Sequence, residues 1–286
     1  MAVATTDVDS TSIGSTPVVV RRGPSFRSKA WAATWPKLLA IAIVVGIWQI
    51  CVWLQLRPEY VVPSPFTVFD AMIHDWHQLL SASVITLKRG AQGFVVAMII
   101  GSVVGIAVAR VKVLRAAIGS MITGLQTMPS VAWVPLAIIL FHSGSGVILF
   151  VVVLGAAPSI ANGIIDGIDH VPPILLRAGR VLGARGLTSL RLVVIPAALP
   201  SVVSGLKQGW AFAWRSLMAA ELVAALPGHV GIGQLLSGAG EQIDFVGVWE
   251  AMITIFIIGV VVDALFFGTA DRAIRRRYGL IDASGS

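Results

Sequence analysis

The chain has 286 residues, of which 56% are hydrophobic and only 12% are charged, and its mean hydropathy is +0.87. These values exclude a soluble globular domain and predict an all-α, polytopic membrane protein. The net charge of +7 does not indicate nucleic-acid binding, because the basic residues are dispersed among predicted helix ends and do not cluster with aromatic residues on one soluble face. No nucleic acid is therefore expected as a partner.

The hydrophobic residues are concentrated in long runs that predict transmembrane helices. One crossing of a hydrocarbon core about 30 Å thick needs about 20 apolar residues. The third run contains Pro129 and Pro135 and could be two broken pieces, and the fifth is long enough to be tilted, so the count lies between five and seven. About six crossings are expected, over residues 37–56, 90–109, 118–141, 147–165, 197–226 and 248–268.

The basic residues predict the orientation of these helices. Sixteen of the 21 Lys and Arg residues lie before the first run, between the second and third, between the fourth and fifth, or after the sixth. Basic residues near helix ends are retained on the cytoplasmic side, so both termini are expected in the cytoplasm. On this topology the outer loops contain Arg57, Lys88 and Arg89. Residues 1–28 lack the apolar core of a signal peptide and are expected to be a disordered cytoplasmic tail, and residues 276–286 are expected to be a second cytoplasmic tail.

No motif in the sequence indicates an enzyme. A GxxxxGK[ST] phosphate loop, HExxH, CxxC and GxSxG are all absent, so no catalytic residues, no metal site and no bound cofactor are expected. A surface helix is predicted over 66–80, with Asp70, His74 and His77 on one face. These three could chelate a metal, but no fourth ligand is evident and a solvated polar face is preferred.

A basic, glycine-punctuated segment over 172–196 separates the fourth and fifth hydrophobic runs. Two short helices are predicted, over 174–182 and 187–195, because Gly183 and Gly186 interrupt the helical pattern between them. The segment reads Arg177-Ala178-Gly179, then Gly183, then Val193-x-Ile195-Pro196. This spacing resembles the cytoplasmic E-A-A-x3-G-x9-I-x-L-P pattern of bacterial ABC importer permeases, with Arg177 in place of Glu and Gly179 in place of the second Ala.

The resemblance implies the type I ABC importer transmembrane-domain fold and a docking role for this segment. In that family the segment sits in a groove of the ATP-binding subunit and transmits its closure, and small residues allow the close approach. A helix that merely binds anionic membrane lipid is the alternative. The positions implied to couple to the ATPase are Arg177, Ala178, Gly179, Gly183, Ala184 and Pro196.

Further matches resemble the permeases of nitrate, sulfonate, taurine and bicarbonate importers. They are Val62-Pro63-Ser64-Pro65, Ala220-Glu221 and the GHVGIG segment over 228–233, and the resemblance covers a permease domain over 36–275. It implies a bacterial plasma membrane protein that carries a small anionic solute. It also implies partners, namely a second copy of the chain, two ATP-binding subunits holding ATP and Mg²⁺, and an extracytoplasmic substrate-binding protein.

The fifth hydrophobic run carries a set of residues that share one helical face. Their spacing of three and four predicts that they line the solute route, because ionisable groups at bilayer depth are costly and should face a cavity or a partner. Pairing of Lys207 with Asp263 is an equal alternative, and Glu221 also suits a gate or a structural hydrogen bond. The face consists of Lys207, Trp210, Trp214, Met218 and Glu221.

Two other functional classes were weighed against the permease. An autonomous ion-coupled secondary carrier or channel could use Glu221, Asp263 and Lys207 as an ion relay. A membrane scaffold without transport is disfavoured, because it would give the buried charges no task. The sequence therefore favours a transport subunit that depends on a separate ATPase.

Overall fold

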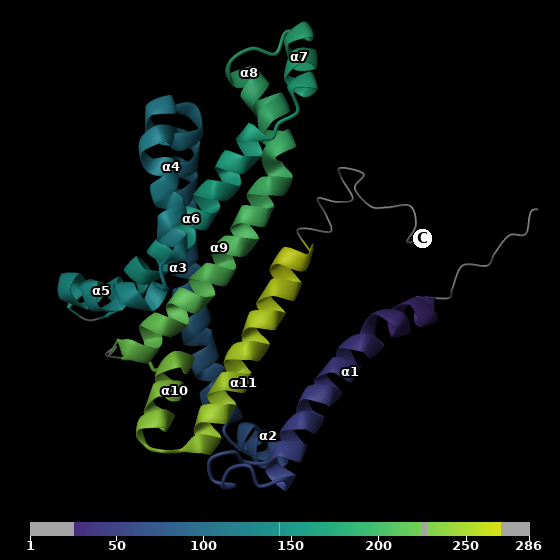
Figure 1. Ribbon diagram of the computed structural model, residues 1–286, viewed down its shortest axis with the longest axis vertical. Helices are drawn as coiled ribbons and strands as arrows, with labels where there is room; N and C mark the ends of the chain where they lie inside the picture. Colours follow the sequence, from purple (N-terminus) through teal and green to yellow (C-terminus); the bar gives the residue numbers. More distant parts are fainter. Residues whose placement is uncertain (1–25, 143, 225–227, 270–286) are drawn as a thin grey trace, which may run out of the picture. The chain divides into compact units, whose positions relative to one another are not determined.

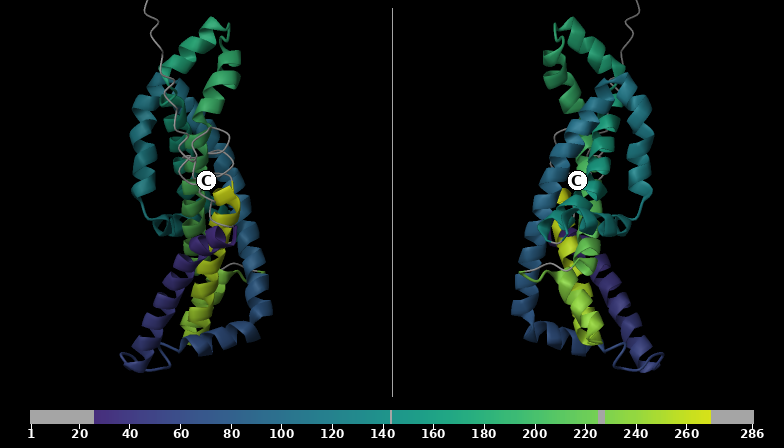
Figure 2. Two further views of the ribbon diagram at one scale, coloured as in Figure 1. Left: turned by 90° about the vertical axis from the view of Figure 1, so that its right-hand side faces the viewer. Right: turned by 90° about the vertical axis from the view of Figure 1, so that its left-hand side faces the viewer.

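The computed structural model describes residues 26–142, 144–224 and 228–269, and the regular secondary structure in these ranges is helical (Figures 1 and 2). The chain divides at Gly46 into two units. The described part of the first is the beginning of α1 (Phe26–Trp53), and the second begins at Ile47. The two predicted tails, residues 1–28 and 276–286, lie outside the described residues except for residues 26–28. These three residues belong to α1, which begins at Phe26.

Three long helices form the centre of the second unit. They are α3 (Trp76–Arg110), α6 (Ser145–Asp169) and α9 (Ile195–Val223), and α6 packs against both of the others (Figure 1). The main apolar core is built around α6 because this helix is buried on most of its surface. The remaining helices are α2 (Pro65–His74), α4 (Lys112–Thr127), α5 (Val134–Phe141), α7 (Pro173–Val181), α8 (Leu187–Ser189), α10 (Ile232–Glu241) and α11 (Phe245–Val262).

Glycines set the close spacing of these three helices. A Cβ atom at Gly163 of α6 would lie 2.5 Å from the Cα atom of Gly205 of α9, so the two backbones touch at this crossing. On the other side of α6, Cβ atoms at Gly101 and Gly105 would lie 2.7 and 2.8 Å from carbonyl oxygens of α6. Gly101 and Gly105 therefore allow α3 to pack closely on α6.

The third hydrophobic run is divided into two pieces, which was the alternative prediction for this run. Met128 has an extended backbone (φ −74°, ψ 132°), and the chain turns by 104° between α4 and the stretch over Ser130–Phe141, which comprises a 3₁₀ turn and α5. Pro129 explains the break, because a proline disfavours helical geometry in the residue before it. The described chain contains five helices long and apolar enough to cross a membrane, or up to six if this bent pair is one crossing.

The second hydrophobic run begins much earlier than predicted. Since α3 starts at Trp76, Lys88 and Arg89 lie inside the helix, and their assignment to an outer loop is wrong. The predicted surface helix over 66–80 is divided at Asp75 into α2 and the first turn of α3. Ser64 caps α2, since its Oγ accepts a hydrogen bond from the backbone N–H of Thr67 at 3.2 Å.

The second short helix after the glycines is continuous with α9. The chain passes from α8 through a π-helical turn, Leu190–Val194, into α9 at Ile195 without a break. Pro196 lies directly after this turn, and its missing N–H accounts for a local change of hydrogen-bond pattern. A second π-helical turn, Asp263–Phe267, extends α11.

Candidate functional site

The residues singled out by the sequence lie at the two ends of α9 and along one of its faces. The segment over 172–196, with α7 and α8, is at one end of α9, and α10 is at the other (Figures 1 and 2). A rigid-body movement of α9 would therefore transmit a displacement from one end to the other.

The turn after α7 takes its shape from small residues. Gly183 and Gly186 have φ angles of +83° and +54°, which favour glycine. The backbone N–H of Ala184 donates to the carbonyl of Gly179 at 2.8 Å, and a Cβ atom at Gly179 would lie 2.9 Å from Cγ2 of Val193. Gly179 and Ala184 are both buried, so these two residues hold α7 against the π-helical turn.

The remaining predicted coupling positions face outward. Arg177, Ala178 and Gly183 are exposed, and Pro196 is half-buried. At the tip, Val181 and Leu182 are 87% and 85% exposed, an apolar pair that the sequence analysis did not single out. The exposed cations of the same segment are Arg177, Arg180, Arg185 and Arg191.

The predicted face of α9 is largely occupied by other helices. Lys207 Nζ lies 3.3 Å from Asp263 Oδ2, so the proposed pair is present. Trp210 is buried against Phe94 of α3, with ring centroids 5.3 Å apart. Trp214 and Met218 border an apolar groove of about 490 Å³ between α9 and α11. These contacts show a packing role, and a role in lining the route remains a prediction.

Glu221 lies in a buried polar cluster at the α10 end of α9. Its carboxylate accepts hydrogen bonds from Thr86 Oγ1 at 2.9 Å, from Arg89 Nη1 at 2.9 Å and from the backbone N–H of Gly233 at 3.0 Å. The Glu221 side chain is fully buried, and that of Arg89 is 17% exposed. Because an unpaired buried charge is costly, the donors make this burial tolerable. We call these four residues with Gly231 and Gln234 the Glu221 cluster.

The Glu221 cluster joins three segments that are far apart in the sequence. Arg89 Nη2 donates to the carbonyl of His229 at 2.8 Å, and Thr86 Oγ1 accepts from the N–H of Ile232 at 2.9 Å. The glycines of the GHVGIG segment are needed here, because a Cβ atom at either Gly231 or Gly233 would lie 2.5 Å from a Glu221 side-chain atom. The cluster thus fixes the loop before α10 to both α3 and α9.

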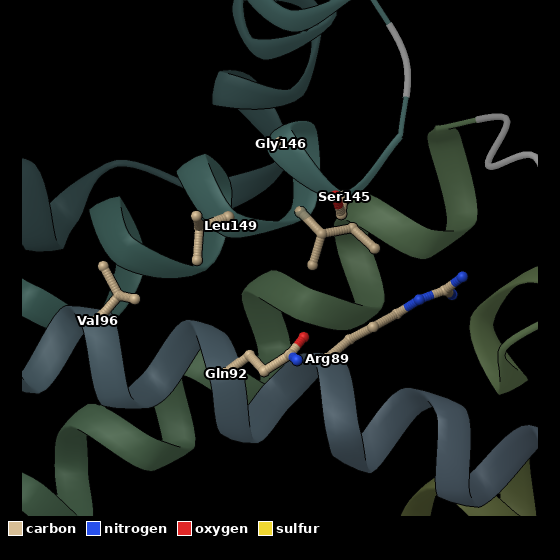
Figure 3. Close-up of a pocket in the computed structure, with 7 residues that line it drawn as sticks. Arg89, Gln92, Val96, Ser145, Gly146 and Leu149 are labelled. Atoms are coloured by element: carbon tan, nitrogen blue, oxygen red, sulfur yellow. The ribbon is translucent and has the colours of Figure 1, made fainter.

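A pocket of about 270 Å³ adjoins this cluster. Figure 3 shows Arg89, Gln92 and Val96 along α3, opposite Ser145, Gly146 and Leu149 of α6. Arg89 therefore borders a cavity with its side chain while its guanidinium binds Glu221. The sequence analysis missed Arg89 because its partner is 132 positions away, although an Arg at the edge of an apolar run is a recognisable signal.

Comparison with known proteins identifies the family of this chain. Residues 97–277 match the family model described as binding-protein-dependent transport system inner membrane component. An ABC transporter permease protein of Methanocaldococcus jannaschii is 30% identical over 233 residues, which cover 79% of this chain and 86% of the relative.

Two further relatives have more specific names. The taurine transport system permease protein TauC of Escherichia coli is 27% identical, covering 83% of this chain and 86% of the relative. The bicarbonate transport system permease protein CmpB of Synechococcus elongatus is 33% identical, covering 63% of this chain and 64% of the relative.

The fold is also found among solved structures. The crystal structure of an amino acid ABC transporter with histidines superposes with a TM-score of 0.57 at 18% identity, covering 73% of this chain and 98% of that one. The chain therefore belongs to the inner membrane components of binding-protein-dependent transport systems, and it is a permease of the ABC importer type.

Proposed function

We propose that this permease works as a pair with a second copy, together with two ATP-binding subunits and an extracytoplasmic substrate-binding protein. The observation that carries the proposal is the exposed apolar tip of Val181 and Leu182, which lies in a segment with four exposed arginines and beside a turn fixed by Gly179 and Ala184. A contiguous apolar surface with a polar rim is typical of a protein contact. The tip therefore supports docking to the ATP-binding subunit better than binding to lipid alone.

The solute of this importer is a small oxyanion or a molecule bearing one. The named relatives belong to taurine and bicarbonate transport systems, and a sulfonate group and bicarbonate share a delocalised negative charge on oxygen. ATP and Mg²⁺ are held by the partner ATPase, and the chain itself holds no cofactor.

The orientation follows from the exposed charge at the two ends of α9. We place the arginine-rich segment over 172–196 in the cytoplasm and the loop before α10 on the outer side, because residues 228–244 contain no Lys or Arg. With six crossings of the bacterial plasma membrane, both termini are then cytoplasmic.

The proposed cycle uses α9 as the connection between the two sides. Closure of the ATP-binding subunits brings the two α7 tips together, and each tip moves the α9 with which it is continuous through α8. The bundle then shifts between outward-open and inward-open states. Substrate-binding protein delivers solute beside the outer loops, near the Glu221 cluster.

Reconstitution in liposomes tests this function. The complete importer should accumulate solute only with ATP and binding protein, whereas the permease alone should stay idle. Accumulation by the permease alone under an ion gradient would contradict the proposal and support an autonomous carrier.

A pair of variants at Gly183 tests docking of the tip. Gly183→Ala and Gly183→Trp carry the same backbone strain at φ +83°, but only the second adds bulk, and a Cβ atom there meets nothing within 4 Å. We expect Gly183→Trp to lower ATP-driven uptake at least tenfold while Gly183→Ala stays within about threefold of the parent. Equal uptake by the two variants would contradict close docking of this turn.

A further inference from the structure

One face of α9 is exposed in the middle of the helix and carries three polar side chains. Ser204, Gln208, Ala211 and Arg215 are all exposed, and their spacing of four, three and four places them on one face of the helix. This face differs from the one that packs on α3 and α11. A polar stripe on a membrane helix faces a partner or a water-filled space, because lipid would leave its polar groups unsatisfied.

Arg215 is the charged member of this stripe, and it lies well inside the helix. Its Cζ atom is 4.5 Å from the centroid of the Phe212 ring, and its Nε donates to the carbonyl of Ala211 at 3.3 Å. In the described part of the chain, no carboxylate pairs with Arg215, whereas Lys207 of the same helix pairs with Asp263. The terminal guanidinium nitrogens of Arg215 therefore keep their donors available.

The break in the third membrane segment faces this arginine. A pocket of about 330 Å³ is lined by residues 125–131, at the turn between α4 and α5, together with Gly155, Phe212 and Arg215. The polar residues among those at the turn are Gln126, Thr127 and Ser130. Pro129 interrupts the helix at this depth, so the turn gives the pocket its width.

One of these polar groups is held rigidly. Gln126 Nε2 donates to Ser159 Oγ at 3.0 Å, and Gln126 Oε1 accepts from Asn162 Nδ2 at 3.1 Å. Both partners lie on α6, and Ser159 is buried. This fixes the orientation of the amide, which has a second N–H to offer to a ligand in the pocket.

We propose that Arg215, with Gln126 and the turn over 127–130, forms an oxyanion-binding site within the membrane on the solute route of this importer. The proposal rests on the proposed transport function and assigns the anion preference to a named side chain. A planar guanidinium can bind two oxygens of one sulfonate, carbonate or nitrate group side by side, which a lysine cannot do. The chloride ion lacks that pair of oxygens.

The site is tested first without transport, by chemical labelling of a cysteine. Cys51→Ser removes the only cysteine, and Thr127→Cys then places a thiol in the pocket of the full-length protein. The probes are two methanethiosulfonate reagents, one carrying a sulfonate and one a trimethylammonium group. We expect the ratio of their labelling rates to fall at least fivefold with Arg215→Gln. It should stay within twofold with Arg215→Lys and with the control Lys88→Gln, which removes an exposed cation from α3.

The second measurement is ATP-driven uptake by the complete importer, with radiolabelled taurine and bicarbonate and with nitrate. Arg215→Gln and Arg215→Lys should each lower uptake at least tenfold, while Lys88→Gln retains it. A labelling ratio unchanged in Arg215→Gln, or unchanged uptake by this variant, overturns the site. If the parent importer carries none of these anions but the labelling ratio still depends on Arg215, the site stands and the proposed solute class fails.

Discussion

Glu221 is a carboxylate in the interior of an apolar chain, and its surroundings explain how it is accommodated. Three side-chain and backbone donors bind it directly, and its charge is matched by Arg89 at 2.9 Å. Removing one partner of a buried pair is more damaging than removing an exposed pair, because the remaining charge stays buried.

Substitutions of Arg89 and Arg115 compare the loss of a buried ion pair with the loss of an exposed one. Arg89→Gln should destabilise the folded protein by about 3–5 kcal/mol, whereas Arg115→Gln should change stability by at most about 1 kcal/mol, because Arg115 and its partner Asp169 are both well exposed. Thermal unfolding in detergent measures both. Similar midpoints for the two variants would show that the Glu221 cluster does not hold the outer loop.

At the residue scale, the sequence predicted some of these contacts and missed others. Glu221 was predicted to line the solute route, with a gate or a structural hydrogen bond as the alternative, and its carboxylate does accept hydrogen bonds. Lys207 was expected to pair with Asp263 in one of two alternatives, and that contact is present. The partners Thr86 and Arg89 were not predicted, since they come from another helix. The pocket beside Arg215 was not predicted, because it depends on how the third segment breaks.

At the element scale, the fold depends on helices that approach within touching distance of their backbones. Gly163 and Gly205 form a close backbone contact between α6 and α9, since a Cβ atom on either residue would lie 2.5–2.6 Å from the Cα atom of the other. Backbone atoms cannot move aside as a flexible side chain can. This crossing is therefore sensitive to an increase in volume.

A leucine at this crossing should separate the two helices. We expect Gly205→Leu to destabilise the protein by about 1–3 kcal/mol or more, through overpacking. The matched control is Gly119→Leu on α4, where a Cβ atom would meet nothing within 4 Å, and its effect should stay within about 0.5 kcal/mol. The fraction of monodisperse protein and the thermal midpoint report both variants, and an unaffected Gly205→Leu protein would contradict the packing described here.

Helix existence was predictable from the sequence, but helix ends were less so. The break at Pro129 was available as an alternative because proline acts on its immediate neighbour, whereas the bend of 104° depends on packing against α6. The start of α3 was placed 14 residues too late, at 90 instead of Trp76, because Lys88 and Arg89 resemble loop residues at the edge of an apolar run. They are accommodated because α3 has 35 residues and is longer than one crossing requires.

At the scale of the whole molecule, α9 connects the two surfaces that the proposed transport cycle uses. The residues before it carry the arginines and the apolar tip, and the residues after it bind to the Glu221 cluster and continue into α10. Because α9 is one of the helices long enough to cross a membrane, these two surfaces should be on opposite sides. The family match could be anticipated from the spacing of Gly183 and Pro196, since the pattern is local in sequence.

A labelling experiment determines which side is which. In the Cys51→Ser background, Leu182→Cys and His229→Cys each place one thiol at an exposed position, before and after α9. The permease is expressed without its ATP-binding subunit, so that docking cannot shield the tip. A membrane-impermeant maleimide applied to cells with a permeabilised outer membrane should label His229→Cys and spare Leu182→Cys. Disrupting the cells should make both thiols reactive.

The expected orientation rests on the distribution of charge. The segment before α9 contains four arginines, whereas residues 228–244 contain no Lys or Arg, and basic residues are retained on the cytoplasmic side. Labelling of Leu182→Cys alone in intact spheroplasts would invert the topology, and with it the proposed contact between the α7 tip and a cytoplasmic ATPase.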